Sequence, residues 1–165
     1  MKRNRTFLLA GVFFMCTLAA CSARVKNVTD LPTDVTHQQA QNWDAAVRNL
    51  HEMATMTSSI RQAIIGLRNA GAFPNNDAYA AALQGVARID QIQLAASDLL
   101  KQQPQAFGQP QKQQIAIYMN LITGEIEKLN AAGATGTKNP DTVKQFNDLL
   151  TNLSNLVKIT LALAS

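Results

Sequence analysis

The amino-acid sequence predicts an all-α protein, an up-down-up-down antiparallel four-helix bundle that follows a cleaved signal peptide and a short tether. From residue 36 onward, apolar residues recur at steps of three and four in four segments, and such steps place them on one face of a helix. The connections between these segments are about six to ten residues long, which favours antiparallel neighbours. We find no strand pattern, internal repeat or second domain in residues 36–165.

The first predicted helix covers residues 37–70. Its apolar stripe consists of Trp43, Val47, Leu50, Met53, Thr57, Ile60, Ile64 and Leu67. Gly71 supplies its stop, because glycine readily adopts the left-handed conformation that ends helices. At 1.5 Å per residue this helix is about 50 Å long, against roughly 35 Å for the others. We therefore expect either a kink near Ser58 and Ser59, whose hydroxyls compete for backbone carbonyls, or an end that projects beyond the bundle.

The second predicted helix covers residues 77–102, after the cap Asn75-Asn76-Asp77 and before Pro104. Its expected stripe is Tyr79, Leu83, Val86, Ile89, Ile92, Ala96 and Leu99. We expect Asp90, between two stripe residues, to be exposed.

The third predicted helix covers residues 110–132 and has Pro110 in its first turn, where a missing N–H costs nothing. Its stripe is Ile115, Met119, Ile122, Ile126 and Leu129, with Ile117 and Leu121 widening the face. Glu125 and Lys128 are three apart and predict a solvated charge pair.

The fourth predicted helix covers residues 140–164 and begins with Asn139-Pro140-Asp141. Its stripe is Val143, Phe146, Leu150, Leu153, Val157 and Leu161.

The first twenty residues have the layout of a secretory signal: a basic start is followed by an apolar segment, Phe7 to Ala20, that is too short to span a bilayer. This segment closes with Leu18-Ala19-Ala20-Cys21, which resembles the lipobox of bacterial lipoproteins. The resemblance covers residues 1–22 and implies cleavage between Ala20 and Cys21, with a diacylglyceryl and acyl lipid carried by Cys21. Cys16 is a poorer candidate, because bulky Phe14 and Met15 precede it. An ordinary cleaved signal or an uncleaved anchor is the alternative.

The lipoprotein resemblance also implies a location in the cell envelope. Ser22 stands where members kept at the inner membrane often carry Asp, which favours the outer membrane, facing the periplasm. Residues 21–35 form a flexible tether that would hold the bundle on the order of 20 Å from the lipid. Processing would remove Cys16 and lipidate Cys21, so no disulfide is expected.

The net charge argues against nucleic acid as a partner. The whole chain carries 15 basic and 11 acidic residues, a net charge of +4. Three basic residues, Lys2, Arg3 and Arg5, lie in the signal, which leaves 12 against 11 after residue 20, or +1. A binding surface for nucleic acid needs a basic cluster in the mature protein.

The residues that could bind a metal or catalyse a reaction form no recognisable constellation. His51, Met53 and Met56 are weak candidates for a soft metal, since His51 and Met53 are two apart on a helix and diverge. A haem held by His51 and Met119 is conceivable. Glu125 and Glu127 also diverge and make a poor acid–base pair. We expect no metal and no cofactor other than the lipid on Cys21, and we expect the protein not to be an enzyme.

Two functions remain. The first is a membrane-tethered, non-catalytic bundle that binds or scaffolds a protein partner, and the apolar end of the fourth helix offers a possible partner surface at Ile159, Leu161 and Leu163. Core packing is the alternative role of these three residues. The second function is a small-ligand- or metal-binding bundle in the periplasm, with a cavity between helices lined by Met53, Met119 or His51.

Overall fold

The computed structural model describes residues 36–102, 107–132 and 140–165. These residues form four helices: α1 is His37–Asn69, α2 is Asn76–Gln102, α3 is Gln109–Ala131 and α4 is Pro140–Leu163. The all-α prediction is confirmed, and each helix boundary falls within one residue of its predicted position. The predicted signal and tether, residues 1–35, lie outside the described residues, and so do Ala20 and Cys21.

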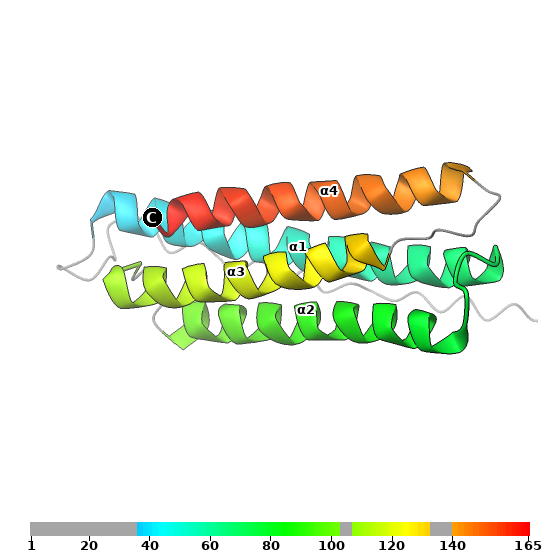
Figure 1. Cartoon of the computed structure of the whole chain (residues 1–165). Helices are drawn as coiled ribbons and strands as arrows, with labels where there is room; N and C mark the ends of the chain where they lie inside the picture. Colours follow the sequence, from blue (N-terminus) through cyan, green and yellow to red (C-terminus); the bar gives the residue numbers. More distant parts are fainter. Residues whose placement is uncertain (1–35, 103–106, 133–139) are drawn as a thin grey trace, which may run out of the picture.

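The four helices make an antiparallel bundle (Figure 1). Each helix packs on the next one along the chain, and α4 returns to pack on α1, so the contacts run in a ring. The start of α1 and the end of α4 therefore lie at the same end of the bundle. At this end the Nζ of Lys112 in α3 also donates a hydrogen bond to the main-chain oxygen of Ser165, at 3.0 Å. The up-down-up-down prediction is confirmed.

Local sequence signals define the ends of the helices. Thr36 caps α1 in a capping box with Gln39. Gly71 takes a left-handed conformation, φ 71°, and the N–H of Ala72 donates to the carbonyl of Leu67 at 2.9 Å, which together close α1 in a Schellman motif. Asn75 caps α2 by accepting the backbone N–H of Ala78 at 2.8 Å. The predicted stop and the predicted cap are both confirmed.

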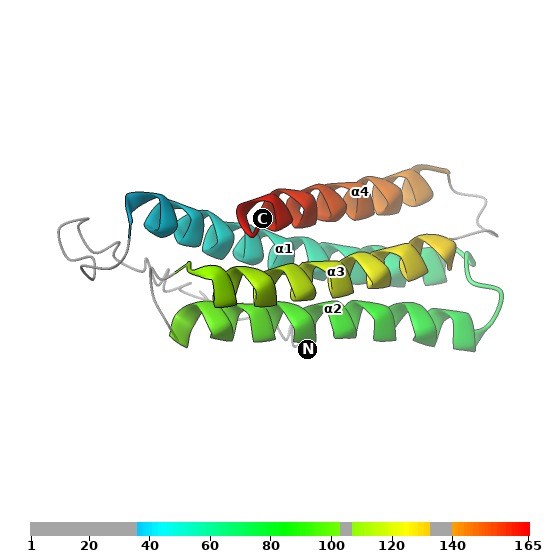
Figure 2. The ribbon, with the colours of Figure 1, turned by 60° about the vertical axis from the view of Figure 1, so that its left-hand side comes forward.

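The extra length of α1 extends past the end of α4, as its first turns show in both views (Figures 1 and 2). The hydroxyls of Thr55, Thr57 and Ser59 do donate to carbonyls four residues back, as expected of this stretch. The helix nevertheless continues unbroken from His37 to Asn69.

The core is built on one repeating pattern. In every helix the buried residues follow one another in alternating steps of four and three, the spacing of helices that cross at a shallow angle. They are Ala46, Leu50, Met53, Thr57, Ile60, Ile64 and Leu67 in α1; Ala82, Val86, Ile89, Gln93, Ala96 and Leu100 in α2, with Gly85; Ile115, Met119, Ile122, Ile126 and Leu129 in α3, with Glu125; and Phe146, Leu150, Leu153, Val157 and Thr160 in α4.

Several residues of the predicted stripes lie elsewhere. Val47 is 37 % exposed, because Ala46 takes the core position beside it. Ile117 and Leu121 are 51 % and 52 % exposed, since they lie on the side of α3 opposite its buried stripe, and the prediction that they widen the core face was wrong. In α2 the predicted Leu83, Ile92 and Leu99 are only partly buried and pack at the edge of the core. Leu161 of α4 does the same.

Two polar core positions join helices in the same way. Thr57 of α1 donates to the carbonyl of Met53 at 2.8 Å and accepts the side-chain amide of Gln93 of α2 at 2.9 Å. Thr160 of α4 donates to its own helix and accepts the amide of Asn49 of α1 at 3.0 Å. Each hydroxyl thus uses both its donor and its acceptor, which removes the cost of burying it.

Glu125 is more buried than we expected. It is 8 % exposed, and its carboxylate accepts Lys128 at 2.6 Å and lies 3.5 Å from Arg88 of α2. The predicted Glu125–Lys128 pair is present, but it is not solvated on the acidic side. Gly85 lies against the same cluster, because a Cβ there would be 3.8 Å from a carboxylate oxygen of Glu125. The same Cβ would come within 3.2 Å of Leu129, so glycine allows α2 and α3 to approach closely.

Candidate functional site

An open groove runs between α1 and α2 on the outside of the bundle. Its volume is about 570 Å³. The α1 side consists of Trp43, Val47, Leu50, His51 and Ala54, and the α2 side consists of Asp90, Gln93, Leu94, Ser97, Leu100 and Lys101. The groove therefore occupies the half of the α1–α2 surface near the start of α1.

The helical repeat explains why the groove is apolar. Leu50 and Leu100 are buried core residues and form the floor. Val47 and Leu94 lie outside the core positions and form the two sides, where they are 37 % and 62 % exposed. Apolar side chains therefore line the groove both on its floor and on its two sides.

The end of the groove near the start of α1 is held by Trp43. Its indole N–H donates to the backbone carbonyl of Leu100 at 3.1 Å, which occupies one of the carbonyls left free at the end of a helix. Lys101 also lines this end and lies 3.3 Å from Asp98. Both side chains of this pair are mostly exposed, so it adds little to stability.

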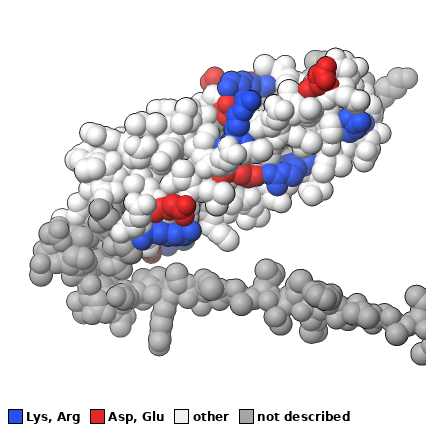
Figure 3. Space-filling view, turned by 90° about the horizontal axis from the view of Figure 1, so that it is seen from below, with Lys and Arg blue, Asp and Glu red and all other residues white. Residues whose placement is uncertain are grey.

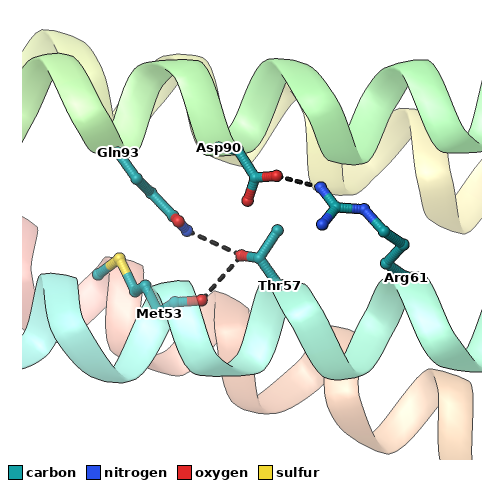
Figure 4. Close-up of polar contacts among 5 residues, drawn as sticks. All are labelled: Met53, Thr57, Arg61, Asp90 and Gln93. Atoms are coloured by element: carbon teal, nitrogen blue, oxygen red, sulfur yellow. Dashed lines mark hydrogen bonds and ion pairs between the residues drawn. The ribbon is translucent and has the colours of Figure 1, made fainter. Parts of the chain in front are cut away.

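The other end of the groove is closed by polar contacts between α1 and α2. Asp90 forms an ion pair with Arg61, and Gln93 reaches across to Thr57 (Figure 4). Asp90 is therefore half-buried in a pair that joins two helices, where we expected it to be exposed beside the stripe. Nearer the α1–α2 connection, the guanidinium of Arg68 stacks on the ring of Tyr79, 4.3 Å from its centre.

The surface around the groove carries its charges in pairs. Seen from below, with α2 toward the viewer, most Lys and Arg atoms lie beside Asp or Glu atoms in small groups separated by wide uncharged areas (Figure 3). The two charged residues that line the groove, Asp90 and Lys101, both follow this pattern. The groove therefore presents a largely neutral surface.

The structure separates the predicted metal candidates. His51 is exposed and lines the groove, Met53 is fully buried in the core, and Met56 is partly buried against the core. Met119, the other residue of the conceivable haem pair, is also fully buried. Within the three described segments, no three His, Cys, Asp or Glu side chains are grouped closely enough to hold a metal ion.

The predicted partner surface on α4 is only partly accessible. Ile159 is exposed, whereas Leu161 and Leu163 are partly buried and pack against the core. Of the three residues, only Ile159 is largely exposed to solvent, while Leu161 and Leu163 contribute to the edge of the core.

Sequence reasoning missed Leu94 and misplaced Val47. Both are large apolar residues that come directly after a buried position, Ala46 in α1 and Gln93 in α2. This position, together with the packing of α1 on α2, is the signal that could have identified them.

A second, smaller cavity of about 150 Å³ lies over the Glu125 cluster and is lined by Arg88 and Lys128. The ionic contacts of this cluster already join α2 and α3, so we assign it a structural role.

Among the helices that the structure describes, none combines the length and apolar character needed to cross a bilayer. Comparison of the chain with protein families, with curated proteins and with solved structures gave no match.

Proposed function

We propose that this protein is a lipid-anchored bundle of the cell envelope that binds or scaffolds a protein partner and does not catalyse a reaction. Cys21 would carry the anchor, most simply at the outer membrane, with the bundle facing the periplasm. The lipobox resemblance of residues 18–21 supports the anchor, and the polar tether after it supports a bundle that stays close to its membrane.

The groove between α1 and α2 is the observation that carries the binding function. Its apolar sides at Val47 and Leu94 remain exposed although the bundle has a complete core beneath them. Exposed apolar surface costs free energy in water, about 25 cal/mol for each square ångström, and a bound partner would recover it. The charged residues at its two ends are held in ion pairs, which suits a binding surface better than proton transfer.

A crosslinked pull-down of the full-length protein from its own membranes tests this proposal, with Cys21→Ala as the control. We expect the unaltered protein to be in the membrane fraction with a specific protein partner, and the variant to be released and to lose that partner. Membrane association that persists in Cys21→Ala would refute the anchor. Absence of any crosslinked protein from the unaltered sample would refute the binding role.

Small-ligand binding is the second candidate function, and the volume of the groove favours it. Sites for small molecules commonly measure about 300–1,000 Å³, a range that includes this groove. The lining differs from the cavity we expected, because it includes His51 but neither Met53 nor Met119. Native mass spectrometry of the protein purified from its membranes would detect a retained molecule, and a mass equal to that of the lipidated chain alone would argue against this function.

A further inference from the structure

We infer that the α1–α2 groove binds an amphipathic helix of the partner protein, about three turns long, through a stripe of uncharged apolar side chains. This inference rests on the proposed protein-binding function and names the kind of partner. Its evidence is the length of the groove, its open side and its neutrality.

The length of the groove fits a short helix. Its lining on α2 runs from Asp90 to Lys101, which at 1.5 Å per residue is about 16 Å. A helix of three turns has the same length. Such a helix presents apolar side chains at positions i, i+4 and i+7, the anchors by which helices bind in grooves of other proteins.

The open side of the groove favours a helix over a small molecule. A small-molecule site typically buries 70–90 % of its ligand, and this requires walls around most of it. Here the two sides are formed by Val47 and Leu94, both exposed, and the outer side is open to solvent. A partner helix would supply that missing wall itself and would cover both exposed side chains.

The charges of the groove define the face of the partner. Asp90 is paired with Arg61 and Lys101 with Asp98, so each charge at the groove already has an opposite charge beside it. A charged side chain brought into the groove would lose its water without gaining an unpaired counter-ion. The complementary surface is therefore uncharged, and charged residues of the partner would lie on its outer face.

Trp43 makes the inference directly testable, because it is the only tryptophan of the chain and lines the groove. The protein would be the mature chain from residue 21 with Cys21→Ala. The probe is a designed helical peptide without Trp, with Leu at i, i+4, i+7 and i+11 and uncharged polar residues elsewhere. A peptide of the same composition with Leu at every second position, and dodecanoate, serve as the comparison probes.

We expect the helical peptide to shift the Trp43 emission in a saturable way and to bind at least tenfold more tightly than either comparison probe. Leu94→Lys should weaken its binding at least tenfold. Ile117→Lys is the matched control, since Ile117 is similarly exposed but lies on α3, and it should leave binding unchanged. Saturable binding of dodecanoate alone, equal binding of both peptides, no binding at all, or equal binding by Leu94→Lys would each overturn the inference.

The same substitutions separate this inference from the proposed function. Full-length Leu94→Lys and Ile117→Lys would be crosslinked in native membranes beside the unaltered protein. Loss of the partner in Leu94→Lys alone supports the groove. A partner retained by both variants refutes the groove and leaves the protein-binding function in place, whereas no partner in the unaltered protein refutes that function.

Discussion

The hydrogen bond between Gln93 and Thr57 should be worth a measurable part of the stability of the bundle. Both residues occupy core positions, where Thr57 is fully buried and Gln93 is 4 % exposed. Thr57→Val keeps the shape of the side chain but removes the oxygen that accepts the amide of Gln93 at 2.9 Å. Leaving a buried donor without a partner costs about 1–3 kcal/mol, so we expect the free energy of unfolding to fall by this amount.

The second substitution distinguishes the lost partner from other effects. Gln93→Leu removes the amide itself, while the hydroxyl of Thr57 still donates to the carbonyl of Met53. Its effect should be small, about 1 kcal/mol or less, because burial of an apolar side chain offsets the lost hydrogen bond. The double variant has no unpaired amide and should be more stable than Thr57→Val alone, with a coupling free energy of about 1–2 kcal/mol.

Urea unfolding followed by far-UV circular dichroism measures all four proteins, with the mature chain carrying Cys21→Ala as the background. A loss of about 1–3 kcal/mol corresponds to a midpoint lower by roughly 0.3–3 M when the slope is about 1–3 kcal/mol per molar. The slopes should be equal, since the native fold is the same. A Thr57→Val midpoint equal to the background, or a double variant no more stable than Thr57→Val, would refute the reasoning.

Three further predictions concern helix ends and glycines. Gly124→Ala should stabilise α3 by about 0.5–1 kcal/mol, because nothing lies within 4 Å of the new Cβ and alanine favours helix; thermal unfolding checks this, and no rise in midpoint would contradict it. Gly71→Ala should instead destabilise by about 1–2 kcal/mol, since its φ is 71°; an unchanged midpoint in the same assay would count against the Schellman motif. Asn75→Ala should cost about 0.5–2 kcal/mol through the lost cap of α2, measured by urea unfolding against exposed Asn76→Ala as control; equal losses in both variants would show that the cap is not the cause.

The helix boundaries could be predicted because their signals are local. The stop at Gly71 and the cap at Asn75 depend on hydrogen bonds between residues no more than five positions apart. The sequence around each of these residues therefore contains every group that takes part. The number of helices and their antiparallel order followed from these signals and from the short connections between them.

The choice of buried face could not be predicted as well, because it depends on neighbouring helices. In α2, Ile92 and Gln93 are adjacent, and apolar character alone favours Ile92 as the core residue. Gln93 is buried instead because Thr57, 36 residues away, accepts its amide. Apolar character also favours Ile117 of α3 as a core residue, although its side chain is exposed.

The candidate site was the least predictable feature. Leu94 follows the predicted stripe residue Ile92 by two positions, and nothing in α2 alone shows that it lies opposite Val47 of α1. The groove exists only because two antiparallel helices place these side chains on its two sides. The pattern of apolar residues within one helix does not show which residues of a neighbouring helix lie opposite it.

The ring of helix contacts has a consequence for the order in which the bundle can form. α2 and α3 each pack on the helices that precede and follow them in the sequence, whereas α4 packs on α3 and also on α1, the first of the four helices. Until Pro140–Leu163 is available, the face of α1 that later receives it, including Asn49, has no helix to cover it. A chain that ends early, before Phe146, would therefore expose an apolar seam along its longest helix, and such surfaces promote aggregation. Completion of the C-terminal helix is thus the step that turns three helices with an open seam into a closed bundle.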